Sequence, residues 1–101
     1  MSEQIPDYIK NGFLQDFKFF IEEEGYDVNT KDENGCTLLH WASISGNIDS
    51  VRYLLEKGAD IDIKNKAGCT ALEYALNVKA YRIFIRLLFE KVIKFFKKIF
   101  N

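Results

Sequence analysis

The chain contains an internal repeat. When residues 25–42 are laid over residues 58–75, at an offset of 33, the turn-forming and apolar positions of the two segments match. The matching pairs are Gly25/Gly58, Asp27/Asp60, Val28/Ile61, Lys31/Lys64, Asp32/Asn65, Gly35/Gly68, Cys36/Cys69, Thr37/Thr70, Leu39/Leu72 and Ala42/Ala75. Internal similarity at a period of about 20–50 residues is typical of chains that stack one supersecondary unit on the next. Such a solenoid offers an extended surface and seldom an enzyme pocket, so a binding module is expected.

Each copy has the pattern of a turn followed by two helices. In the second copy, Gly35 can supply the positive φ that a tight turn needs, and Thr37 is placed as a helix N-cap. Apolar residues at helical spacing then predict helices over 38–45 and 48–57, and Gly58 is expected to end the second of these. The second copy is therefore the complete unit.

The flanking copies are less regular. In the third copy, helices are predicted over 71–76 and 80–89, and the first of them begins with a capping box at 70–73. A degenerate first copy precedes the others, and its short first helix is expected to begin near Pro6. One extra residue within 22–24 brings the first copy back into register with the repeat before Gly25. Its second helix carries three apolar residues in place of Val51, Leu54 and Leu55, namely Phe17, Phe20 and Ile21.

The two turns carry a recognisable motif. They read Asp32-x-x-Gly35-x-Thr37-x-Leu39-His40 and Asn65-x-x-Gly68-x-Thr70-x-Leu72-Glu73. Both resemble the D-x-x-G-x-T-P-L-H signature of the ankyrin repeat, which has a period of about 33 residues. The resemblance implies an all-α ankyrin-repeat solenoid within residues 1–90. It would have about three helix-turn-helix repeats, the first and last atypical, at about 3–31, 32–64 and 65–90. It also implies that His40 braces neighbouring turns by hydrogen bonding.

No grouping of residues points to catalysis or to a cofactor. His40 is the single histidine, and neither Cys36 nor Cys69 has a second candidate base. The sequence shows no Cys/His cluster at metal-ligand spacing, no serine in a nucleophile elbow and no glycine-rich phosphate loop. We therefore expect no enzyme activity, no cofactor, no metal and no small-molecule substrate.

Cysteine usage and the N-terminal residues predict the location. The first twelve residues lack the basic start and the apolar run of a secretory signal. Two cysteines without an export signal are expected as free thiols in a reducing compartment. The expected location is the cytoplasm, or the host cytoplasm if the source is an intracellular pathogen or a virus.

The resemblance also predicts the residues that contact a partner protein. In ankyrin repeats these are the turn tips and the exposed side of the first helix. The matching residues here are Glu33, Asn34, Cys36, Trp41, Ile44, Ser45, Lys66, Ala67, Cys69, Tyr74, Asn77 and Val78. Trp41 and Tyr74 are expected side by side on the inner surface, and both residue types are favoured at binding hot spots. The alternative is that the two rings mainly pack against neighbouring helices.

The C-terminal segment differs from the rest of the chain in charge. Residues 1–78 carry seven Lys/Arg and fourteen Asp/Glu, a net charge of −7, whereas residues 79–101 carry seven Lys/Arg and one Glu, a net charge of +6. This asymmetry predicts an acidic partner for the segment. Nucleic acid fits less well than a membrane or a protein, because the basic stripe is short and the domain beneath it is acidic.

This segment is predicted to be one amphipathic helix over 80–100, because no glycine matches Gly58. Its core-facing residues are expected at the places of Val51, Leu54 and Leu55, namely Phe84, Leu87 and Leu88. Residues 91–101 are predicted to be a basic extension beyond the repeats. The residues expected to contact a membrane or a partner helix are Ile85, Phe89, Val92, Lys94, Phe95, Phe96, Lys97, Lys98, Ile99 and Phe100.

Three roles are open for residues 91–101. The extension could lie on an anionic membrane, or pair with a second copy or another protein, or bend near residue 90 and fold back to close the stack. The function that the sequence favours is non-catalytic protein–protein recognition on the concave face. The alternative is a peripheral membrane protein that uses residues 91–100 and presents a partner at the bilayer.

Overall fold

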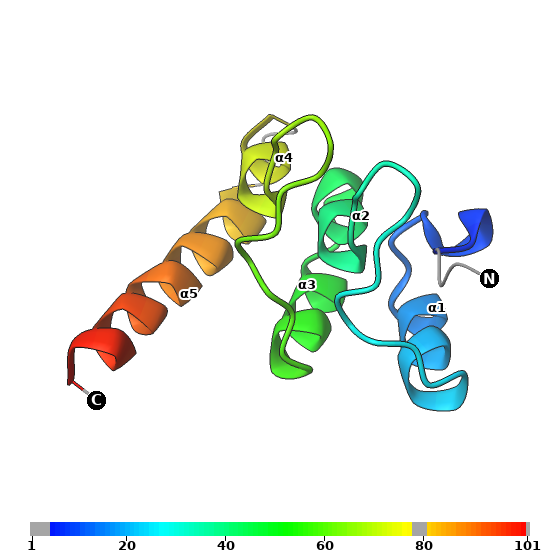
Figure 1. Ribbon diagram of the computed structural model, residues 1–101, viewed down its shortest axis with the longest axis horizontal. Coiled ribbons are helices and arrows are strands. Elements are labelled where there is room, and N and C mark those ends of the chain that lie inside the picture. The colour runs from blue at the N-terminus through cyan, green and yellow to red at the C-terminus, as the bar shows by residue number, and fades with distance from the viewer. Residues whose placement is uncertain (1–4, 78–80, 101) are drawn as a thin grey trace.

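The computed structural model describes residues 5–77 and 81–100 of the chain (Figure 1). The elements in chain order are η1 (Asp7–Ile9, a 3-10 turn), α1 (Leu14–Lys18), η2 (Phe19–Glu23, a π-helical turn), α2 (Leu38–Ser45), α3 (Ile48–Glu56), α4 (Ala71–Asn77) and α5 (Tyr81–Phe100). These two ranges contain no β-strand, and the only bridge in them pairs Lys31 with Thr37. Successive helix pairs stack in a row, so the predicted all-α repeat architecture is confirmed (Figure 1).

The second pair, α2 and α3, follows directly from local sequence signals. The Thr37 hydroxyl accepts the backbone N–H of His40, and the His40 ring accepts the N–H of Thr37 in return, which completes a capping box. Gly46 ends α2 at a φ of 75°, where a residue without a Cβ meets no clash. Asn47 then caps α3 by accepting the N–H of Ser50. Both helices match their predicted ranges to within one residue.

The first pair is the irregular one. Its first element is a single 3-10 turn with Pro6 at the N-cap, so the predicted short helix is reduced to one turn. The helix that follows changes from α1 to the π-helical turn η2, where the N–H of Glu24 donates to the carbonyl of Phe19. A π turn takes in one residue more than an α turn. This turn accounts for the extra residue that the alignment places within 22–24.

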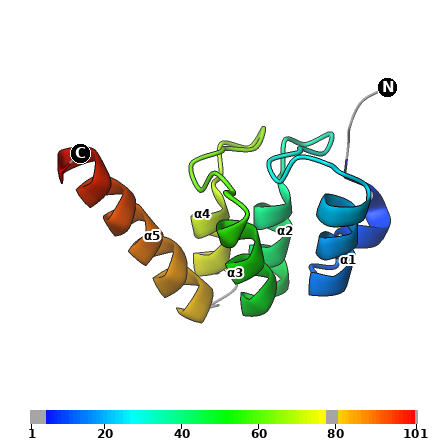
Figure 2. The same cartoon turned by 90° about the horizontal axis from the view of Figure 1, so that it is seen from below.

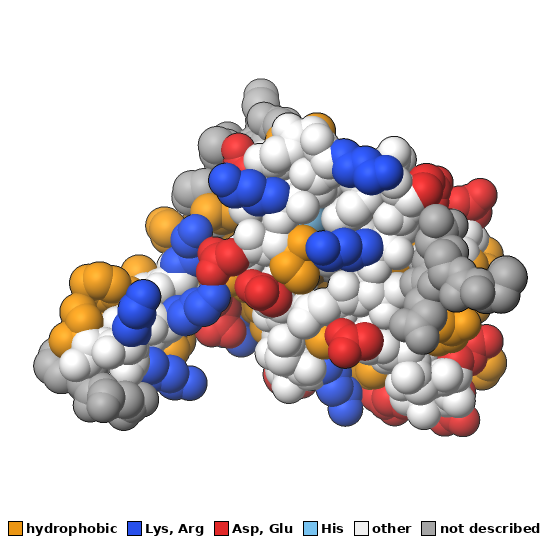
Figure 3. All heavy atoms as spheres, in the orientation of Figure 1, with side chains coloured by type: hydrophobic (Ala, Val, Ile, Leu, Met, Phe, Trp, Pro, Cys, Tyr) orange, Lys and Arg blue, Asp and Glu red, His pale blue; other side chains and the backbone are white. Residues whose placement is uncertain are grey.

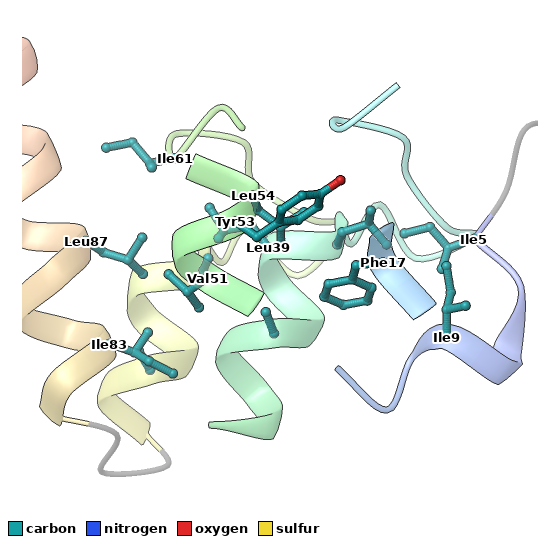
Figure 4. Close-up of a cluster of buried hydrophobic side chains, with 14 of the residues drawn as sticks. Ile5, Ile9, Phe17, Leu39, Val51, Tyr53, Leu54, Ile61, Ile83 and Leu87 are labelled. Atoms are coloured by element: carbon teal, nitrogen blue, oxygen red, sulfur yellow. The ribbon is translucent and has the colours of Figure 1, made fainter. Parts of the chain in front are cut away.

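One continuous core runs through all three pairs (Figure 4). Its most deeply buried members include Phe17, Phe20, Leu39, Val51, Leu54, Ala75, Ile83 and Leu87, none more than 1% exposed. Helix α2 packs against α3 and α4, and α4 packs against α5. Because each pair covers the next, the apolar faces of the middle helices are removed from water, which is the main stabilising contribution in a repeat stack.

Hydrogen bonds join the turns of neighbouring repeats. Nε2 of His40 lies 2.8 Å from the carbonyl oxygen of Cys69. The backbone N–H of Lys66 donates to the carbonyl of Asn34 at 2.9 Å. His40 therefore links the second repeat to the third, as the family resemblance implied.

Helix α5 is much longer than α3 and continues without interruption from Tyr81 to Phe100. The prediction of a single helix is confirmed from residue 81 onwards, and residue 80 lies outside the described residues. The alternative of a bend near residue 90 is wrong, because the backbone stays helical through that position. Viewed from below the stack, α5 leans away from α3 toward its C-terminal end (Figure 2).

The side of α5 that meets the stack agrees with the prediction at Leu87 and differs from it at Leu88. Ile83 and Leu87 point into the core (Figure 4), whereas Leu88, which was predicted to be buried, is 44% exposed. Phe84, the other predicted core residue, lies outside the described side chains. Ile83 aligns with Ser50, which is itself fully buried. The repeat alignment missed this position because a buried serine does not contribute to a hydrophobic pattern.

Candidate protein-binding surface

Most of the predicted contact residues lie on the turn tips and on the helices α2 and α4. The two turns project side by side from one edge of the stack (Figure 2). We call this surface the aromatic face, defined by Glu33, Asn34, Trp41, Ile44, Ser45, Lys66, Ala67, Cys69 and Tyr74. Within it, the tip residues are exposed, and both aromatic rings are half-buried.

Three predicted contact residues are not part of this face. Cys36 is only 6% exposed and lies beneath the next turn, where the Asn65 amide donates to its sulfur at 3.3 Å. A partner cannot reach it without opening the turn, so we leave it out. Asn77 is the last residue of α4, and Val78 lies outside the described residues.

Trp41 is fixed by the turn of its own repeat. Its indole Nε1–H donates to a carboxylate oxygen of Asp32 at 3.0 Å. The other oxygen of that carboxylate accepts the backbone N–H groups of Asn34 and Cys36, each at 2.9 Å. One buried carboxylate therefore shapes the turn and orients the indole at the same time.

Tyr74 occupies the equivalent place in the third repeat, with donor and acceptor exchanged. The Asn65 side-chain amide donates to the Tyr74 hydroxyl oxygen at 2.8 Å. Its Oδ1 accepts the N–H groups of Ala67 and Cys69, each at 3.0 Å. An indole N–H can only donate, whereas a phenol oxygen can also accept. This difference explains why an aspartate in one repeat becomes an asparagine in the next.

Sequence reasoning did not assign Asp32 and Asn65 to the aromatic pair. The signal was present, because each polar residue precedes its aromatic partner by nine positions in both copies. In each repeat one side chain of the turn holds the ring by a hydrogen bond. Two aromatic side chains are thereby presented in a fixed arrangement.

Lys10, in the first repeat, was also missed. Its Nζ lies 5.5 Å from the centre of the Trp41 ring. The same nitrogen is 2.9 Å from the Asp7 carboxylate, 3.4 Å from Glu33 and 3.7 Å from Asp32. The hydrogen bond to Asp7 is the main cause that raises the pKa of Lys10 above its ordinary value. Lys10 belongs to the degenerate first repeat, and the repeat spacing does not indicate that it contacts Trp41.

His40 connects the second and third repeats as a neutral imidazole. The N–H of Thr37 donates to Nδ1 at 3.0 Å, so Nδ1 carries a lone pair and Nε2–H donates to the Cys69 carbonyl. Burial lowers the pKa of His40 below its ordinary value, and this outweighs the opposing effects of the Cys69 carbonyl and of Asp32. A second ring proton, on Nδ1, would point at the Thr37 N–H and remove the acceptor of that hydrogen bond, and the capping box would be broken.

Lowering the pH from about 7.5 to about 5.5 should therefore destabilise the protein. The unfolded chain, with an ordinary histidine pKa of about 6.5, takes up a proton that the folded chain resists. The stabilisation is present above that pKa and is lost as the pH falls through it, by at most about 1.4 kcal/mol per pH unit. Urea unfolding at several pH values measures this slope. His40→Gln removes the only histidine and should flatten it, and a slope that survives the substitution would contradict the assignment.

The second predicted site lies on α5, whose side toward the stack carries ion pairs. Lys91 lies 3.5 Å from the Asp62 carboxylate, and Lys94 pairs with both Asp62 and Asp60. The hydrogen bond from Lys94 is the main cause that lowers the pKa of Asp62. Lys94, which was predicted to contact a membrane or a partner helix, joins α5 to the arm before the third turn by these ion pairs, and its side chain is 60% exposed. Lys97 and Lys98 are exposed, and Phe100 is the last residue of α5.

Six apolar residues predicted for the second site lie on the outer side of α5, together with Leu88, which was predicted to be buried. We call them the α5 stripe, and each is between 43% and 63% exposed: Ile85, Leu88, Phe89, Val92, Phe95, Phe96 and Ile99. Hydrophobic side chains follow the outer edge of α5 in Figure 3, and Lys and Arg side chains lie between this edge and the acidic side chains of the stack. The stripe is therefore displayed on the surface and takes no part in the core.

The described residues show no arrangement suited to metal chemistry. Within 5–77 and 81–100, no group of three or more His, Cys, Asp or Glu side chains is placed to hold a metal ion. Cys36 and Cys69 are free thiols, and burial raises the pKa of Cys36. None of the helices in these two ranges combines the length and the apolar character that crossing a membrane requires.

Comparisons with known proteins agree with this architecture. A segment of 53 residues is 36% identical to 26S proteasome non-ATPase regulatory subunit 10 of Dictyostelium discoideum, and covers 52% of this chain and 23% of that protein. Another segment of 35 residues is 52% identical to human (Homo sapiens) palmitoyltransferase ZDHHC17, and covers 35% of this chain and 6% of that protein. The chain thus spans less than a quarter of these curated relatives.

A solved structure resembles most of the chain. It is the complex of the predatory endopeptidase Bd0816 from Bdellovibrio bacteriovorus with the immunity protein Bd3460. One chain of this complex matches with a TM-score of 0.77 and 32% identity, over 87% of this chain and 46% of its own length. The family model described as ankyrin repeats (3 copies) matches residues 7–98. The chain therefore belongs to the ankyrin repeat family.

Proposed function

We propose that this chain is a non-catalytic module that binds a partner protein on the aromatic face. The observation that carries the proposal is the pair Trp41 and Tyr74, each held by the turn of its own repeat with part of the ring exposed. Rings that are already fixed lose little conformational entropy on binding, and both residue types are enriched among hot-spot residues. The pair would anchor the partner, and the turn tips would set its specificity.

The comparisons support a role in protein recognition. Ankyrin repeats are typically a non-catalytic module, and the matches to curated relatives cover only their repeat segments. The solved complex that contains the matched chain joins an immunity protein and an endopeptidase. The solved structure that contains a similar chain is therefore a complex between two proteins.

The charges at the two turn tips suggest what the partner presents. Glu33 on the second repeat and Lys66 on the third occupy equivalent, exposed places with opposite charge. Lys10 lies beside Glu33 and partly compensates its charge. A complementary partner would place an acidic group near Lys66, and its apolar or aromatic side chains between the tips and the rings.

Bulky charges at the tips test this proposal without disturbing the core. Asn34→Arg/Ala67→Arg changes two exposed side chains, and only backbone atoms of these residues form the turn hydrogen bonds. A partner can be identified by a photocrosslinker at position 34 of the intact chain, and its Kd measured by calorimetry. We expect the double variant to weaken this Kd at least tenfold.

The matched control is Arg52→Ala/Glu56→Arg, which changes two exposed residues of α3 away from the turns. It should leave the Kd within about twofold of the value for the intact chain.

Trp41→Ala/Tyr74→Ala should abolish binding. It also removes two intrachain hydrogen bonds, so its melting temperature must be compared with that of the intact chain. If the tip variant kept its affinity for the partner and the α3 control lost it, the binding site would lie on the α3 side of the stack.

A further inference from the structure

The α5 stripe lies on the side of the helix opposite to the core contacts. Successive residues of an α-helix are about 100° apart, so Ile83 and Leu87 are on the reverse side of α5 from Val92 and Ile99. The first two are each 1% exposed, whereas Val92 and Ile99 are 43% and 54% exposed. A surface that contacts the stripe therefore approaches from outside, without displacing the repeats.

Charge decides which kind of surface fits. Helix α5 contains six Lys/Arg and one Glu, a net charge of +5. A second copy would bring an identical helix of the same sign, which gains no charge complementarity, whereas an anionic bilayer brings the opposite sign. Lys97 and Lys98, the exposed cations of the last turn, lie on the polar side of α5, and their long side chains can reach toward anionic headgroups from that side.

The dimensions of the stripe suit an interfacial helix. From Ile85 to Ile99 it extends over about 21 Å at about 1.5 Å per residue, and it contains three phenylalanines and four aliphatic residues. A helix with an apolar aromatic side and a lysine-rich side lies in the plane of the membrane, with the apolar side among the acyl chains. Clustered basic residues add attraction to anionic lipids.

The acidic repeats do not prevent this arrangement. They lie across the width of α5 from the stripe, about 10 Å, which is close to the Debye length at physiological salt. Asp60 and Asp62, two acidic side chains that contact α5, are already paired with Lys94 and Lys91. Repulsion between the stack and anionic headgroups is therefore screened or compensated where the two come closest.

From these contacts we propose that the α5 stripe is a docking surface for an anionic lipid bilayer. Helix α5 lies parallel to the membrane plane, with the stripe in the interface and the repeats on the water side. The aromatic face then remains in solution. This inference stands independently of the proposed partner binding, because the two surfaces share no residue.

Flotation with lipid vesicles tests the proposal directly. The intact chain should float with vesicles of phosphatidylcholine that contain about 30% phosphatidylserine, and at least tenfold less with phosphatidylcholine alone. Val92→Gln/Phe95→Gln should reduce flotation on the anionic vesicles at least tenfold. The matched control, Phe13→Gln/Phe19→Gln, removes phenylalanines that are 60% and 50% exposed on the first repeat, and should float as the intact chain does.

Three results would overturn the proposal. The first is failure of the intact chain to float on anionic vesicles, and the second is a loss of binding in the control as large as that in the stripe variant. The third is a dimer of the intact chain in analytical ultracentrifugation that does not float and that Val92→Gln/Phe95→Gln dissociates. This result would assign the stripe to a second copy. Circular dichroism melting of both variants checks that the repeats remain folded.

Fluorescence quenching tests the orientation without removing any apolar side chain from the stripe. Trp41 is the only tryptophan and lies on the aromatic face, where Asp32 holds its indole. On anionic vesicles with brominated acyl chains, the intact chain should therefore show little quenching. Trp41→Phe/Phe95→Trp, which moves the indole to the stripe, should be quenched at least twofold. The opposite pattern would place the aromatic face on the membrane and contradict the proposed orientation.

Discussion

Leu87→Ala should lower the free energy of unfolding by about 2–5 kcal/mol, whereas Leu88→Ala, at the next position of α5, should lower it by less than about 1 kcal/mol. Leu87 is 1% exposed and packs into the core, but Leu88 is 44% exposed on the outer side. Truncating a buried leucine loses its transfer free energy and leaves a cavity, because the surroundings relax only in part. The two substitutions are chemically identical and lie in one helix, so their difference isolates burial.

Urea unfolding of the two variants at one pH measures this difference. If the effects were equal, or if Leu88→Ala were the more destabilising, α5 would be rotated toward the side that the repeat alignment indicated. The α5 stripe would then face the core, and the proposed membrane surface would lose its basis. The pair therefore tests the geometry on which the further inference depends, without using any lipid.

Gly12→Ala should destabilise the protein by about 2–4 kcal/mol, through backbone strain and a steric clash together. Gly12 has a φ of 85°, in the left-handed region that residues with a Cβ adopt at a cost. An added Cβ would lie 2.6 Å from the Cβ of Ser45. The Gly12 carbonyl also accepts the Ser50 hydroxyl at 2.6 Å, so this residue holds the first repeat against the second.

Gly58→Ala separates the two contributions to this cost. Gly58 has a φ of 90°, but an added Cβ would meet nothing within 4 Å. Its substitution should cost only the backbone strain, about 1–2 kcal/mol. Ser45→Gly in the Gly12→Ala background should recover the steric part. Equal costs for the two glycine variants, measured by urea unfolding, would show that the close approach between Gly12 and Ser45 is absent.

Much of the fold could be predicted because its signals are local. A threonine at an N-cap, a glycine at the end of a helix and a turn closed by one side chain each act over a few residues. The prediction of α2 over 38–45 matches the structure, and that of α3 differs by one residue. The first repeat was harder, because a 3-10 turn and a π turn replace regular α-helix and leave only a weak periodic pattern.

The candidate sites could be predicted only in outline. The aromatic pair was identified from its spacing, and its role in binding stays a prediction. The contacts that orient it were missed, because the hydrogen bonds of Asp32 and Asn65 depend on how each turn folds over its helix. Lys10 reaches Trp41 from another repeat, at a distance that no sequence period encodes.

The sequence by itself determined the repeat period, the helix-turn-helix units and their caps, because the hydrogen bonds that define them close within single turns of the chain. Only the tertiary structure decided which side of α5 is covered. Apolar residues such as Ile83, Leu87 and Leu88 lie around most of its circumference, so periodicity alone allows more than one rotation. Packing against α4 and ion pairs with Asp60 and Asp62 select the rotation that is found. Burial is a property of the neighbours that a helix meets, and these are fixed only when the repeats stack.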